Sequence, residues 1–300
     1  MTRTIEILKR FLGYFVFSSV SIGLTGCAMY SGTPFASPVS STTIGLYTKL
    51  AEKNEPSLSG DIDAFKKDGH FHTVAYIAAI AGLENRAIEL ACYSQAPDEI
   101  KRYNAVPVAV WGVISWDYRR RIMDTLHSLH GGDYAAVARR RSILHQLVKV
   151  SSASRTRDWE TGFLIHALGD SFAHVHGDLE KPEAFGSLVG HGFEFFNDPD
   201  EIFGGAEPNK NYHKYVAYTS SLFEALSTSS NAIGRTALAS FQNDIAQKAQ
   251  SAREPLDVIS TLHAYGGTFK EQDCERLYNE IDDTKVRAFL VDLERKLATG

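Results

Sequence analysis

Residues 158–176 read DWETGFLIHALGDSFAHVH. Apolar side chains recur along it at helical spacing: Trp159, Phe163, Leu164 and Leu168. The spacing predicts one long helix over residues 158–174. His166, Asp170 and His174 follow one another at four-residue intervals, so a helix places all three on one face. Two imidazoles around a carboxylate are costly to bury without a partner, and they suit a divalent metal ion.

His176 extends this cluster, because it lies where the predicted helix ends and can turn onto a neighbouring ion. A run of ligand-type residues this dense is typical of a metal site. The alternative is a structural one, in which surface histidines cap the helix end or pair with carboxylates.

The rest of the chain also has helical patterns, and strand signals are scarce. The expected helices cover residues 72–92 (with a break at Gly82), 119–129, 134–150, 215–226, 232–252 and 284–297. Pro97 ends the first pattern at residues 94–98, because proline disfavours helical geometry in the residue before it. Residues 105–116 are compatible with a strand, a hairpin or a lid. The predicted fold class is all-α: a single multi-helix domain over residues 57–300 around a buried metal cluster.

The first 26 residues have the layout of a bacterial secretory leader. A basic start precedes an apolar run, residues 11–24, that is short for a transmembrane span. The run ends in Leu24-Thr25-Gly26-Cys27, which resembles the bacterial lipobox. The resemblance implies cleavage before Cys27 and acyl chains on that cysteine, which anchor the protein to a membrane. An ordinary leader with a chance cysteine is the alternative.

Residue 28 is alanine rather than the aspartate that retains such lipoproteins at the inner membrane. If the source is Gram-negative, the lipobox resemblance therefore implies the outer membrane, facing the periplasm. Residues 27–56 are rich in serine, threonine, proline and glycine, which predicts a flexible tether. The net charge of −5 gives no electrostatic footprint for nucleic acid. Cys92 and Cys274 permit a disulfide in an exported protein, and two separate buried thiols are the other possibility.

Two motifs resemble a known family. Residues 163–170, FLIHALGD, with a histidine ten positions after His166, are similar to the signature of the zinc-dependent phospholipase C and single-strand nuclease superfamily. Residues 69–78, GHFHTVAYIA, are similar to its first metal-binding helix, with His72 at the ligand position. The resemblance covers residues 68–200 and leaves the expected C-terminal helices, residues 210–300, unmatched. It suggests a divergent bacterial lipoprotein member.

The resemblance implies two or three zinc ions and a set of ligands spread along the chain. Asp98 is expected to be both a ligand and the catalytic group that orients water. His130 is an alternative to His127, and His174 belongs with a broader group of bacterial relatives that carry His-x₃-Asp-x₃-His. The expected ligands are His72, Asp98, His127, His166, Asp170, His174, His176 and His191.

Two ligands of the named enzymes have no direct counterpart. An N-terminal tryptophan binds metal there, whereas the lipobox places an acylated Cys27 at the mature N-terminus, so Asp68 or His70 is expected to substitute. The carboxylate expected four residues after His191 must come from a neighbour: Glu194, Asp198 or Asp200.

These features together predict an exported, lipid-anchored, phospholipase C-like zinc phosphodiesterase that uses metal-activated water. The membrane anchor favours a phospholipid substrate, and a nuclease-type phosphodiesterase is one alternative. The other alternative is a catalytically inactive metal-binding envelope lipoprotein with a binding or immunity role.

Overall fold

The computed structural model describes residues 68–111, 115–187, 202, 210–228, 230–251 and 274–299. The chain divides into two units, Met1–Lys49 and Leu50–Gly300, and every described residue belongs to the second. The leader, Cys27 and the expected tether therefore lie outside the described residues, as do His191 and its candidate carboxylate partners.

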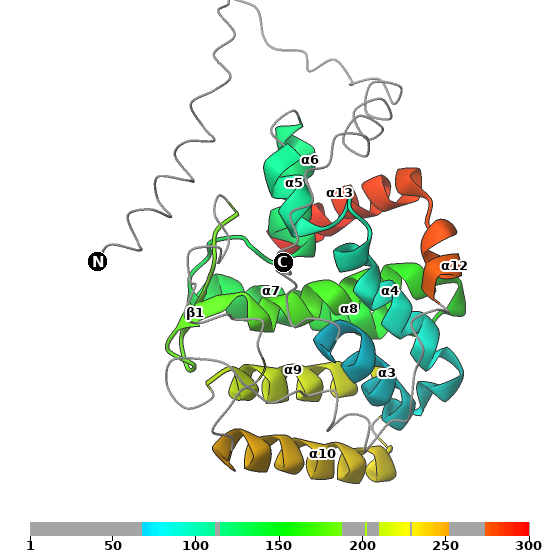
Figure 1. Ribbon diagram of the computed structural model, residues 1–300, viewed down its shortest axis with the longest axis vertical. Coiled ribbons are helices and arrows are strands. Elements are labelled where there is room, and N and C mark those ends of the chain that lie inside the picture. Colours follow the sequence, from blue (N-terminus) through cyan, green and yellow to red (C-terminus); the bar gives the residue numbers. More distant parts are fainter. Residues whose placement is uncertain are drawn as a thin grey trace, which may run out of the picture. The chain divides into compact units, whose positions relative to one another are not determined.

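The described part is built from helices, which confirms the all-α prediction (Figure 1). Its one sheet pairs two short antiparallel strands, with Val175 opposite Ala184. In chain order the elements are η1 (Asp68–His72), α3 (Thr73–Ala78), η2 (Ala79–Leu83), η3 (Glu84–Arg86), α4 (Ala87–Glu99), α5 (Ala105–Trp111), α6 (Trp116–Arg120), η5 (Arg121–Leu126), α7 (Tyr134–Ser152), η6 (Arg155–Arg157), α8 (Asp158–Ala173), β1 (Val175–Gly177), β2 (Pro182–Ala184), α9 (Lys210–Leu226), α10 (Ala232–Ser251), α12 (Cys274–Asn279) and α13 (Asp283–Thr299).

Helix α8 is the element around which the others pack (Figure 1). Most of its residues are buried, because α4, α7 and α9 all lie against it. Gly162 lets α4 come close: a Cβ there would lie 2.6 Å from the carbonyl carbon of Tyr93 and 2.8 Å from the backbone nitrogen of Ser94. The sequence prediction of this helix, residues 158–174, agrees with α8 to within one residue.

Helix α4 corrects the expectation that the helical pattern ends at residues 94–98, because it runs through Pro97 to Glu99. Proline removes one backbone donor from a helix and crowds the carbonyl four residues earlier, so the local preference opposes this continuation. The segment is also buried, from Ser94 to Asp98, so tertiary packing outweighs the local preference. Residues 105–116, which were compatible with a strand, hairpin or lid, contain α5 and the start of α6.

Two links tie the central helices to neighbouring segments. Buried Arg86 pairs with Asp158 at the start of α8, and its guanidinium also donates to the carbonyl of Ser152 at 2.7 Å. Cys92 on α4 and Cys274 on α12 form a disulfide, which was one of the two possibilities for these cysteines. Among the described residues, no helix is both long and apolar enough to cross a membrane.

Candidate metal centre

Histidine and aspartate side chains from separate elements meet beside α8. Each of them is at most 9% exposed. They are His70 from η1, Asp98 from α4, His127 directly after η5, His166 and Asp170 from α8, and His174 directly after α8.

Asp170 lies at the centre of this cluster. Its Oδ1 is 2.9 Å from Nε2 of His70. Its Oδ2 is 3.0 Å from Nδ1 of His127 and 3.2 Å from Nε2 of His166. The two oxygens of one carboxylate thus contact different histidines.

The two carboxylate oxygens of Asp98 also face different histidines, at longer distances. Its Oδ2 is 3.9 Å from Nε2 of His70, while its Oδ1 is 3.9 Å from Nδ1 of His127 and 3.8 Å from Nε2 of His166. Each carboxylate therefore has one oxygen near His70 and the other near the His127–His166 pair, while the rings of His70 and His166 themselves lie 4.2 Å apart, centroid to centroid.

Backbone carbonyls fix the orientation of the imidazole pair. His166 donates its Nδ1–H to the carbonyl of Ser94 at 3.0 Å, and His127 donates its Nε2–H to the carbonyl of Tyr103 at 2.9 Å. A carbonyl oxygen only accepts, so these bonds leave the other nitrogen of each neutral ring with a lone pair. Ligating histidines in metalloproteins are oriented in this manner.

The nitrogens that carry these lone pairs face one another. Nε2 of His166 lies 3.1 Å from Nδ1 of His127, and both lie near Oδ2 of Asp170. Acceptors gathered this closely repel one another unless a proton or a cation lies among them. The donor set, imidazole nitrogen with carboxylate oxygen, is one that divalent metals bind.

Burial shapes the charges in the cluster. It lowers the pKa of the His166 imidazole to about 3, against the opposing effect of Asp170, so the ring is neutral at neutral pH. For Asp170, burial acts to raise the pKa, but the neighbouring imidazoles of His166, His174 and His127 outweigh it and hold the pKa well below its ordinary range. The centre therefore presents a carboxylate and neutral imidazole at neutral pH, the protonation states in which these groups bind metal.

Within the described part of the chain, two overlapping sets of three side chains can hold a metal ion: His70, His166 and Asp170, and also Asp98, His127 and His166. In each set the ligand atoms all lie within 4.8 Å of one another. His166 has only Nε2 to offer, since its Nδ1 is engaged by Ser94. It can therefore serve one ion at a time.

The first motif supplies His70 rather than His72 to these sets. Residues two apart on a helix point about 200° apart, so only one of the two histidines can face Asp170. Gly169 on α8 leaves room for His70: a Cβ there would lie 3.0 Å from its Cε1 and 3.2 Å from Cζ of Tyr218. The spacing of the two histidines could not tell which one faces inward, although His70 was already a substitute candidate.

The remaining predicted ligands lie at or beyond the edge of the cluster. His174 donates its Nδ1–H to the carbonyl of His127 at 2.6 Å and lies 3.7 Å from Oδ2 of Asp170. His176 is exposed on β1, with its ring against Phe185. His130, the alternative to His127, instead accepts from the backbone N–H of Gly132 at 3.1 Å.

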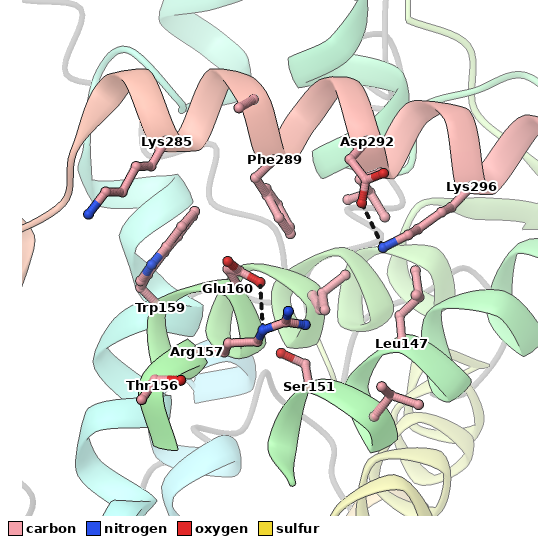
Figure 2. Close-up of a pocket in the computed structure, with 14 residues that line it drawn as sticks. Leu147, Ser151, Thr156, Arg157, Trp159, Glu160, Lys285, Phe289, Asp292 and Lys296 are labelled. Carbon is pink, nitrogen blue, oxygen red and sulfur yellow. Dashed lines mark ion pairs between the residues drawn. The ribbon is translucent and has the colours of Figure 1, made fainter. Parts of the chain in front are cut away.

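A pocket of about 540 Å³ lies elsewhere in the domain, between α13 and the helices α7 and α8 (Figure 2). Trp159 and Phe289 line its interior, and charged side chains surround them. None of its lining residues belongs to the histidine–aspartate cluster.

In comparisons with known proteins, no family model, no curated protein and no solved structure matches this chain.

Proposed function

We propose that this protein is an exported, lipid-anchored phosphodiesterase that uses zinc held at the buried histidine–aspartate centre. One observation carries the proposal: Asp98 and Asp170 each direct one oxygen toward His70 and the other toward the His127–His166 pair. Carboxylates placed in this way are suited to bridging two neighbouring cations, and paired cations are typical of phosphoester hydrolases.

The donor set favours zinc over other abundant divalent ions. Imidazole and carboxylate ligands in a compact set are usual for zinc, whereas magnesium and calcium prefer oxygen alone. Bound zinc would lower the pKa of water from 15.7 to about 7 and neutralise the charge that develops on the phosphoryl oxygens.

The chain's own residues then have distinct roles. Asp170 holds the centre together, because it contacts His70, His127 and His166 at once. Asp98 is the most exposed residue of the cluster, at 9%, and its carboxylate is the group best placed to accept a proton from an attacking water. No protein nucleophile is required in this scheme.

A phospholipid substrate fits the proposal best, since the lipobox of residues 24–27 would place the enzyme on a membrane. A nuclease-type activity uses the same phosphodiester chemistry, and the acidic net charge of −5 does not favour it.

A second candidate is a metal-binding envelope lipoprotein without turnover. The observation that favours it is burial: His70, His166 and Asp170 are 0% exposed, and His127 is 1% exposed. Structural zinc sites are closed by protein ligands, whereas catalytic sites keep a position open for water.

Metal stoichiometry and hydrolysis on the same sample separate the two candidates. The purified full chain is analysed for zinc and assayed on bis-p-nitrophenyl phosphate, with and without a chelator. The enzyme proposal expects two or three zinc ions per chain and hydrolysis that chelation removes and zinc restores. Asp98→Asn should abolish hydrolysis, whereas His213→Gln, at an exposed histidine of α9, should leave it unchanged.

One zinc ion and no hydrolysis would overturn the enzyme proposal, especially if Asp98→Asn changed only the melting temperature. Phospholipid vesicles and single-stranded DNA, assayed in parallel, distinguish the phospholipase from the nuclease alternative.

A further inference from the structure

The clearest unexplained feature near the metal centre is a chain of contacts that reaches it from the C-terminal helix. Tyr103 is fully buried between α4 and α5, and its carbonyl accepts the Nε2–H of His127 at 2.9 Å. Its hydroxyl donates to Oδ1 of Asp283, the first residue of α13, at 3.1 Å. One residue thus touches both a candidate ligand and a helix 180 positions away.

The side chain of Tyr103 is held on several sides. Its ring packs edge-on against Phe163 of α8, with 5.6 Å between the ring centroids. The guanidinium of Arg102 lies over the same ring, 4.8 Å from its centroid, and its Nε lies 3.4 Å from Oδ1 of Asp283. A tyrosine restrained in this way has little freedom to shift its own backbone carbonyl.

Asp283 is in turn fixed by its neighbours. Nε of Arg287, one turn further along α13, donates to Oδ2 of Asp283 at 2.8 Å. Arg102 and the Tyr103 hydroxyl both face Oδ1. The carboxylate thus joins α13 to the turn that follows α4.

We propose that Asp283 and Tyr103 are positioning residues for the metal centre, which hold His127 in the tautomer and orientation that direct Nδ1 at the metal. The inference rests on the metal centre of the proposed function, and it does not depend on hydrolysis. Hydrogen bonds from the second nitrogen of a ligating histidine fix ring orientation, and their loss typically costs 10-fold to 100-fold in metal affinity.

A simpler role for Asp283 must be separated from this one. An acidic residue in the first turn stabilises a helix through its dipole, so losing Asp283 would lower the melting temperature through α13 alone. Zinc affinity is the readout that such a role would not move.

The test measures zinc affinity of the full chain by competition with a chromophoric chelator. Asp283→Ala and Tyr103→Phe keep the carbonyl itself but loosen it, so each should weaken binding by up to about 10-fold, the lower end of the cost of losing that partner. Asp283→Asn keeps an oxygen that can accept from Tyr103 and should recover most of the affinity. Asp292→Ala removes a carboxylate from the same helix that pairs only with Lys296 and Arg295 among the described residues, and should change affinity less than about 2-fold.

A double-mutant cycle shows whether the effect passes through His127. In a His127→Ala background, Asp283→Ala should weaken zinc binding no further. The visible spectrum of the cobalt-substituted protein gives a second readout, because Asp283→Ala and His127→Ala should disturb it in the same way. Circular dichroism checks that each variant is folded. If Asp283→Ala fails to fold, Tyr103→Phe still tests the contact, because it removes only a hydroxyl.

The inference is overturned if Asp283→Ala and Tyr103→Phe lower only the melting temperature, or if their effect on zinc persists without His127. A loss of affinity in His127→Ala but not in Asp283→Ala rejects the positioning role alone. Equal zinc binding by the wild type and His127→Ala would reject the metal centre of the proposed function, and the positioning role with it.

Discussion

The buried histidine–aspartate cluster and the pocket beneath α13 both use residues of α8, yet they are built in opposite ways. The pocket is lined in part by three residues of α8: Trp159, Glu160 and Leu164. The cluster uses two residues that come next along the same helix, His166 and Asp170. Every polar group of the cluster is buried, and backbone carbonyls orient its rings. One helix thus carries a buried, oriented polar cluster only a few residues from a partly exposed pocket.

The charged side chains of the two regions differ in their exposure to solvent. In the pocket, Nε of Arg157 lies 3.9 Å from Oε2 of Glu160, and Nζ of Lys296 lies 2.6 Å from Oδ2 of Asp292 (Figure 2). All of these side chains are partly exposed. Exposed ion pairs of this kind contribute little, about 0–1 kcal/mol. In the cluster, the buried Asp170 carboxylate has no solvent to compensate a lost partner, so each contact matters more.

The largest effect should follow from Asp170→Asn, which keeps the shape of the side chain and removes its charge. We expect the variant to lose bound zinc. With free zinc at about 1,000 times the dissociation constant, this loss lowers the free energy of unfolding by about 4 kcal/mol. Zinc analysis and urea unfolding with added zinc measure both quantities.

The matched control is Asp292→Asn, the same change at a partly exposed, ion-paired aspartate of the pocket. It should retain zinc and stay within about 0.5 kcal/mol of the wild type. Equal losses in the two variants would mean that the cluster is no more sensitive than the pocket.

A smaller effect is expected from acid in the presence of a chelator. Burial lowers the pKa of His166 to about 3, so the folded ring resists a proton that the unfolded chain accepts below about 6.5. This contribution is fully present above the unfolded pKa and is lost as the pH falls toward the folded one. Stability should therefore decrease by up to about 1.4 kcal/mol per pH unit between pH 6 and 4.

Urea unfolding of the chelated protein at several pH values checks this slope. His166→Gln should make it shallower. Burial lowers the pKa of His130 to about 4, so this residue contributes to the slope in the same direction. His130→Gln therefore reports the part of the slope that arises outside the histidine–aspartate cluster. A slope that His166→Gln leaves unchanged would show that this ring does not govern the acid response.

The sequence was most informative where the signal is local. Apolar spacing predicted α8, and four-residue spacing placed His166 and Asp170 on one face, because both depend only on helical geometry. The Cys92–Cys274 pair could be named as a possible disulfide but not decided, since pairing depends on packing across 182 residues.

Other parts of the site depend on tertiary structure that a pattern does not carry. The orientation of η1 selects His70 over His72, and the turn into β1 leaves His176 exposed. Burial of Pro97 keeps Asp98 on a continuous helix. The contact between Tyr103 and Asp283 joins residues whose sequence neighbourhoods carry no shared signal.

The smallest effect should come from Trp159→Phe in the pocket. Trp159 packs against Phe163 and Phe289, with ring centroids 5.7 and 5.5 Å apart, and it is only partly buried. A smaller ring keeps part of both contacts, so we expect a loss of about 1 kcal/mol in unfolding free energy and no change in zinc content. Thermal unfolding and zinc analysis measure this. Because Phe163 also packs against Tyr103, a loss of zinc in Trp159→Phe would instead show that the pocket and the cluster are coupled through α8.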